Sequence, residues 1–139
     1  MTGNTAMRMG RIGFLAALLF AVPTAVAPFL TQAIAEEKFP DVIAAKIKPL
    51  GGDRFDFDVT ISSPYDTPRR YADGFRVVGP KGEVYGERKL LHDHANEQPF
   101  TRDLHGVTIP AGLGTVIVEA RDLSYGYGGR KLEVALPGR

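Results

Sequence analysis

The chain has 139 residues, with 17 lysines and arginines against 16 aspartates and glutamates, three histidines and no cysteine. The near balance of charge excludes a strongly basic nucleic-acid-binding surface. The absence of cysteine excludes disulfides, thiolate metal sites, iron–sulfur clusters and cysteine nucleophiles, so the fold must be held by packing alone.

The N-terminal region predicts an export signal over residues 1–35. Arg8 and Arg11 precede an uncharged apolar run at residues 12–30. An alanine-isoleucine-alanine stretch follows directly and ends at Ala35, which is the small-x-small pattern that signal peptidase recognises. Cleavage is therefore expected after Ala35.

An uncleaved membrane anchor is the alternative, because the apolar run is nearly long enough to span a bilayer. Pro23 and Pro28 interrupt the run, which favours cleavage. Cleavage leaves 104 residues with 15 basic and 16 acidic side chains, enough for one domain with a single core. We expect a short lead at 36–40, a domain at 41–139 and a periplasmic or secreted location, with membrane contact only through an uncleaved signal.

Short strands separated by turn residues are predicted throughout the mature chain. The alternation is clearest in residues 54–62, where Phe55, Phe57, Val59 and Ile61 share one face. Glycine, proline and β-branched residues interrupt every candidate helix. The seven predicted strands are residues 43–50, 54–62, 71–79, 83–91, 100–110, 115–122 and 131–137.

This strand count and turn spacing predict an all-β sandwich. Residues 115–137, TVIVEARDLSYGYGGRKLEVALP, resemble the last hairpin of immunoglobulin-like and fibronectin type III-like domains, where a regular strand leads through an Asp and a glycine-rich loop into the final strand. The resemblance implies a seven-stranded immunoglobulin-like antiparallel sandwich. It concerns architecture only, since the cysteines and tryptophan that mark immunoglobulin domains are absent, and such a fold does not specify a function.

The predicted connections between strands alternate in length. Residues 51–53, 79–82 and 110–114 form tight turns, whereas the three long connections are residues 62–70, 92–99 and 122–130. Successive connections of a sandwich lie at opposite ends, so all three long loops are expected at one end. Loops on a rigid scaffold are frequent binding sites. The alternative is that this end is irregular without a role.

Aromatic and basic residues in two of these loops predict partner contacts. Tyr125 and Tyr127 lie in LSYGYGG, and Tyr65, Arg69 and Arg70 lie in SSPYDTPRR. Tyrosine offers a broad, stiff contact area at low entropic cost, and the arginines could meet carboxylates, phosphates or sugars. Alternatively, a tyrosine packs across the mouth of the core and the arginines are solvated rim charges.

The remaining long loop contains a candidate metal site. His92 and His94 are two residues apart, so on an extended segment they point to the same side and could both reach one Zn²⁺ or Cu²⁺ ion. Glu97 is the nearest further ligand, and Asp66 or Asp122 could arrive from neighbouring loops. The alternative is a pair of solvated or hydrogen-bonded loop histidines.

The sequence gives little support for catalysis. A serine–histidine–aspartate triad could be assembled, but there is no nucleophile-elbow motif. Asp56 and Asp58 alternate outward on a strand, and His105 is expected to point outward as well. The GYGG stretch lacks the strand-to-helix context of phosphate-binding loops.

We therefore expect an exported accessory domain without catalytic activity and without a cofactor. It would recognise a protein or a small ligand, not nucleic acid, through the clustered long loops. The alternative function is that of a periplasmic zinc- or copper-binding protein that uses His92 and His94.

Overall fold

The computed structural model describes residues 2–3, 13, 37 and 39–139. The predicted signal helix and the cleavage site after Ala35 lie outside the described residues. In the part that is described, no helix is long and apolar enough to cross a membrane.

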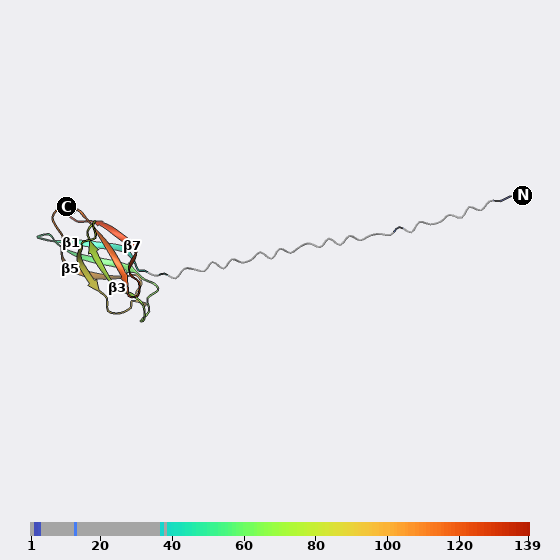
Figure 1. Cartoon of the computed structure of the whole chain (residues 1–139), viewed down its shortest axis with the longest axis horizontal. Helices are drawn as coiled ribbons and strands as arrows, with labels where there is room; N and C mark the ends of the chain where they lie inside the picture. The colour runs from blue at the N-terminus through green and yellow to red at the C-terminus, as the bar shows by residue number, and fades with distance from the viewer. Residues whose placement is uncertain (1, 4–12, 14–36, 38) are drawn as a thin grey trace. The chain divides into compact units, whose positions relative to one another are not determined.

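In residues 39–139, seven antiparallel strands form two sheets, which confirms the all-β sandwich prediction. One sheet has the order β1-β2-β5, and the other has the order β4-β3-β6-β7. Figure 1 labels β1 and β5 of the first sheet and β3 and β7 of the second. Within residues 39–139 no helix occurs. The strands are β1 (Asp41–Gly51), β2 (Arg54–Ser62), β3 (Ala72–Val78), β4 (Val84–Lys89), β5 (Phe100–Thr108), β6 (Thr115–Asp122) and β7 (Gly126–Ala135).

The core lies between the two sheets, where the alternating apolar residues meet. The predicted inward face of β2 is fully buried, and so is the corresponding face of β6. Removal of this apolar surface from water is the main driving force for the fold. The buried residues of these two strands are Phe55, Phe57, Val59 and Ile61 of β2 and Val116, Val118 and Ala120 of β6.

The two ends of the sandwich differ in the length of their connections. At one end the backbone N–H of Ile109 donates to the carbonyl oxygen of Asp53, at 2.9 Å, and the C-terminal Arg139 contacts Asp53 at 2.6 Å. At the other end the connections 63–71 and 90–99 are long and meet through a hydrogen bond from the His94 backbone to Asp66. The prediction that these two loops share an end is confirmed.

The predicted long loop over residues 122–130 is wrong. Strand β7 begins at Gly126, and only residues 123–125 separate it from β6. One carboxylate oxygen of Asp122 accepts the backbone N–H groups of Ser124 and Tyr125, each at 2.8 Å. This local side-chain-to-backbone pattern closes a tight turn where the sequence indicated a long connection.

The glycines that indicated a loop are part of β7 and accommodate the N-terminal segment. A Cβ atom on Gly128 would lie 2.3 Å from the ring of Phe39, and one on Gly129 would lie 2.3 Å from the carbonyl oxygen of Pro40. Gly129 also has a φ of +73°, which side chains rarely adopt. The glycine run therefore provides space for another segment rather than flexibility.

Candidate binding site at the loop end

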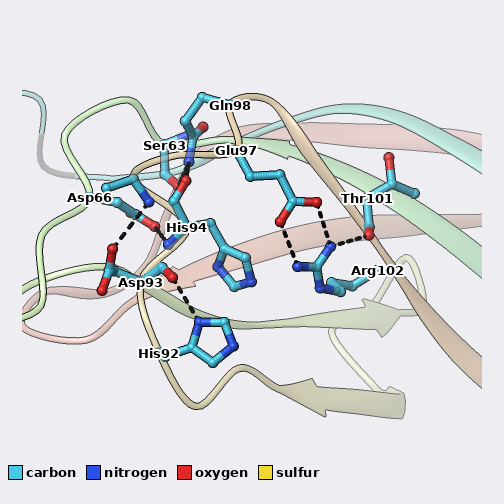
Figure 2. Close-up of polar contacts among 10 residues, drawn as sticks. Ser63, Asp66, His92, Asp93, His94, Glu97, Gln98, Thr101 and Arg102 are labelled. Atoms are coloured by element: carbon cyan, nitrogen blue, oxygen red, sulfur yellow. Dashed lines mark hydrogen bonds and ion pairs between the residues drawn. The ribbon is translucent and has the colours of Figure 1, made fainter.

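Residues 63–71, 90–99 and 123–125 are called the loop end below. Asp66 joins the first two of these segments. Its carboxylate is buried and accepts the backbone N–H of Ala72 through Oδ1 and that of His94 through Oδ2, both at 3.0 Å. Gln98 adds a second link, since its Oε1 accepts the backbone N–H of Ser63 at 2.8 Å (Figure 2). The long loops are thus held to each other by defined hydrogen bonds.

Arg70 forms the centre of a compact aromatic and ionic cluster at the loop end. Its guanidinium lies 4.3 Å from the ring centroid of Tyr65 and 4.8 Å from that of Tyr125. Its Nε lies 3.3 Å from Oδ2 of Asp122, whose side chain is fully buried. Its Nη2 donates to the carbonyl oxygen of Glu37 at 2.7 Å. The cation is therefore held by two rings, a buried carboxylate and the N-terminal segment.

The structure thus brings together three of the five predicted partner-binding residues, Tyr65, Arg70 and Tyr125, but mainly in contacts within the chain. Burial, together with the nearby Asp122 carboxylate, raises the pKa of Tyr65 above its ordinary value. Arg69, the residue before Arg70 in the sequence, is exposed. Of the three gathered residues, only Tyr125 is substantially exposed, so the cluster mainly supports the loop end.

Tyr127 lies apart from this cluster, on the outer face of the four-stranded sheet. Its hydroxyl donates to Glu87 Oε2 at 3.1 Å, and the guanidinium of Arg76 lies 3.7 Å from its ring centroid. Burial and the Glu87 carboxylate raise the pKa of Tyr127 to about 12. The phenol is therefore protonated at neutral pH, and its ring is held in place by neighbours on two strands.

A groove of about 480 Å³ runs along this outer face up to the loop end, and we call it the outer groove. Its apolar part includes Leu91, which is 80% exposed, and the partly exposed Leu123. Its polar part includes an ion pair between Asp73 and Arg121. The outer groove is lined by Tyr71, Asp73, Gly74, Glu87, Arg88, Lys89, Leu90, Leu91, Arg121, Leu123 and Tyr127.

Sequence reasoning found only Tyr127 among these residues. The others come from strands and loop segments that are distant in sequence, so no local motif contains them. The one local signal was the leucine pair Leu90-Leu91 directly before a polar loop. In the structure Leu90 is buried, whereas Leu91 is exposed at the rim of the groove.

The two candidate metal-binding histidines lie side by side, as their spacing predicts. The rings of His92 and His94 are neighbours (Figure 2), with their centroids 4.8 Å apart. The ring of His94 also stacks on Phe100, at a centroid distance of 3.9 Å. Nδ1 of His92 lies 2.7 Å from the carbonyl oxygen of Asp93. His94 is buried, whereas His92 is exposed. The pair therefore combines one fixed ring and one accessible ring.

The predicted further ligands are engaged elsewhere. Both carboxylate oxygens of Glu97 accept hydrogen bonds from Arg102, at 3.2 and 2.9 Å, and this contact lowers the pKa of Glu97. Asp66 and Asp122 hold backbone N–H groups, as described above, and His105 lies on β5 between two other acids. Among residues 39–139 no three histidine, aspartate or glutamate side chains are grouped so that they could hold a metal ion. The metal site stays a prediction.

A smaller hollow of about 170 Å³ adjoins the outer groove at the histidine pair, and we call it the basic hollow. It lies between the end of β4, the segment 90–99 and the start of β5. The hollow and the outer groove share four lining residues, so they form one continuous surface feature. The basic hollow is lined by Arg88, Lys89, Leu90, Leu91, His92, His94 and Arg102.

The burial of His94 predicts a loss of stability in mild acid. Burial, together with the positive charges of Arg102 and His92, lowers the pKa of His94 below the ordinary value of 6.5. His94 is therefore protonated near pH 6.5 in the unfolded chain, but only at a lower pH in the folded chain. The contribution of the neutral His94 ring to stability is complete above about pH 6.5, and it is lost as the pH falls from there to the folded-state pKa. Replacing His94 with phenylalanine keeps the stack on Phe100 and is expected to flatten the decrease, measured by urea unfolding at several pH values. The exposed His92→Phe variant should retain the decrease, and an unchanged pH profile in His94→Phe would contradict the expectation.

No family model matches the chain, and no solved structure matches it. The chain is similar to a protein of Halomicrobium mukohataei that is named "Putative lipoprotein", with 34% identity over 94 residues. The matched region is 68% of this chain and 46% of that relative, so the chain spans less than half of the relative's length.

Proposed function

We propose that this chain is an exported, non-catalytic accessory domain of the cell envelope or exterior, which captures a partner through the outer groove. The observation that carries the proposal is the concave surface beside the loop end, where two tyrosines and two exposed leucines surround an ion pair. The outer groove combines apolar contact area with fixed polar groups, which is the usual composition of a binding site.

The polar floor of the outer groove supports a binding role. The Asp73 side chain is almost fully buried, and its Oδ2 pairs with Arg121. Its other oxygen, Oδ1, has no hydrogen-bond partner among the described residues. Buried polar groups are nearly always satisfied, and exceptions are expected where a ligand supplies the partner. The floor therefore retains a hydrogen-bond acceptor that none of the described residues satisfies.

Two observations support export. The sequence begins with a basic segment, an apolar run and a small-residue cleavage pattern, which are the parts of a signal peptide. The relative described above carries a lipoprotein name, and lipoproteins are proteins of the cell envelope. The 139 residues contain no cysteine, so a cysteine-linked lipid is not part of this proposal.

The sheet order supports an immunoglobulin-like architecture as the finer description of the fold. β2 pairs with β5, and β3 pairs with β6, while the chain passes from one sheet to the other between β2 and β3 and again between β4 and β5. Such crossing connections are typical of Greek-key sandwiches, the group to which immunoglobulin-like domains belong.

Site-specific photo-crosslinking tests the partner surface. Leu91 is replaced by photoreactive p-benzoylphenylalanine in cells that naturally produce the protein, and Leu50 is replaced in a matched control. Both leucines are exposed, but Leu50 lies at the end of β1, away from the outer groove. We expect a discrete crosslinked species at position 91 only, reduced about fivefold or more by Tyr127→Ala. Equal products at both positions, or none at position 91, would contradict the proposal.

A further inference from the structure

The lining of the basic hollow contains cationic and neutral side chains but no carboxylate. Arg88 pairs with Asp103 at 3.2 Å and Arg102 pairs with Glu97 at 2.9 Å, yet neither acid belongs to the lining. Lys89 makes no ion pair with any residue that the structure describes. An open surface with this charge attracts an anionic group.

His94 adds a hydrogen-bond donor to the lining. The residue is 4% exposed, and its Nδ1 is buried without a hydrogen-bond partner among the described residues. A buried N–H without an acceptor is costly, so the proton of the neutral ring belongs on Nε2, which is not buried. A nitrogen that carries a proton donates to an anion, whereas a metal ion requires the free lone pair. The environment of His94 therefore favours an anion over a metal ion.

Glu97 shows that a carboxylate already binds at the edge of the basic hollow. Arg102 donates to both oxygens of Glu97, as Figure 2 shows, and the Glu97 side chain is 57% exposed. Exposed ion pairs of this kind contribute little to stability. A carboxylate from outside the chain could therefore replace Glu97 on Arg102 at low cost, in a hollow that Lys89 also lines.

We propose that the basic hollow binds a carboxylate of an acidic segment of the partner protein, while apolar side chains of that segment occupy the outer groove. The inference rests on the proposed function, because the two surfaces are continuous. Lys89, His94 and Arg102 supply the donors. A protein segment is favoured over a small anion because the shared lining residues Leu90 and Leu91 place apolar surface directly beside the charged groups.

The test is titration of the protein with a fluorescent peptide of alternating glutamate and leucine, and with its glutamine counterpart, measured by polarisation. We expect saturable binding of the glutamate peptide only. Glu97→Gln removes the internal competitor and should raise the affinity about two- to fivefold, whereas Lys89→Gln and Arg102→Gln should lower it. Lys46→Gln makes the same charge change at an exposed position of β1 and should have no effect.

The remaining outcomes each overturn the inference. Equal binding of both peptides would exclude recognition of the carboxylate, and saturation by inorganic phosphate alone would assign the hollow to a different anion. Stabilisation by Zn²⁺ or Cu²⁺ that is weakened by Glu97→Gln would establish the metal site, because this substitution has opposite effects on the two kinds of ligand. A crosslink at position 91 without peptide binding would leave the proposed function intact and remove only this inference.

Discussion

Replacing Arg70 with methionine is expected to lower the free energy of unfolding by about 3–5 kcal/mol. Methionine retains an apolar stem between the rings of Tyr65 and Tyr125 but removes the cation. The carboxylate of Asp122, which is 0% exposed, would then remain buried without its ionic partner. Urea unfolding near neutral pH measures the loss.

Two variants separate this effect from a general loss of positive charge. Arg69→Met removes the adjacent arginine, which is exposed and makes no ion pair within the described part of the chain, and we expect a change within about 0.5 kcal/mol. Arg70→Met combined with Asp122→Asn should recover much of the stability, because an asparagine oxygen can still accept the N–H groups of the turn. Equal stability of Arg69→Met and Arg70→Met would contradict the role assigned to the buried pair.

Replacing Gly129 with alanine is expected to lower the free energy of unfolding by about 2–5 kcal/mol. Two costs combine at this position. The φ of +73° is unfavourable for any side chain, and the new Cβ would lie 2.3 Å from the carbonyl oxygen of Pro40, which is backbone and has little freedom to move. The expected result is weaker attachment of the N-terminal segment to β7, measured by urea unfolding and by protease cleavage near Phe39.

Gly126→Ala is the matched control for this prediction. Gly126 has a similar φ of +81°, but no atom lies within 4 Å of the position of its Cβ. Gly126→Ala should therefore lower the free energy of unfolding only by the cost of placing a side chain at a positive φ, about 1–2 kcal/mol. The difference between the two variants measures the close approach of the N-terminal segment, and equal losses would contradict that contact.

Local chemistry explains which parts of the fold were predictable. The strict alternation of β2 allows only one face to be buried, and β6 shows a similar pattern, so both strands were predicted with the correct bounds. The last strand was predicted to begin at residue 131, whereas β7 begins at Gly126, because the glycines in this stretch are equally compatible with a loop. What extends the strand to Gly126 is the turn closed by Asp122 and the packing of Phe39 and Pro40, which involves residues far away in sequence.

In the candidate site, too, local spacing predicts some contacts, whereas residues distant in sequence decide others. The proximity of His92 and His94 follows from their spacing and was predicted. Glu97 was assigned to them as a ligand, but the structure pairs it with Arg102, because a guanidinium offers two parallel donors to one carboxylate. Arg70 was assigned to the surface, but the structure places its guanidinium against the fully buried Asp122.

The sequence by itself determined that this protein is an all-β domain with a predicted export signal, because strand alternation and signal-peptide composition are local properties of the chain. Only the tertiary structure decided which polar residues support the loop end and which ones line an accessible surface. The outer groove and the basic hollow depend on side chains from β3, β4, β5, β6, β7 and the loop end. Their juxtaposition is produced by sheet pairing over long sequence separations, which no local pattern encodes.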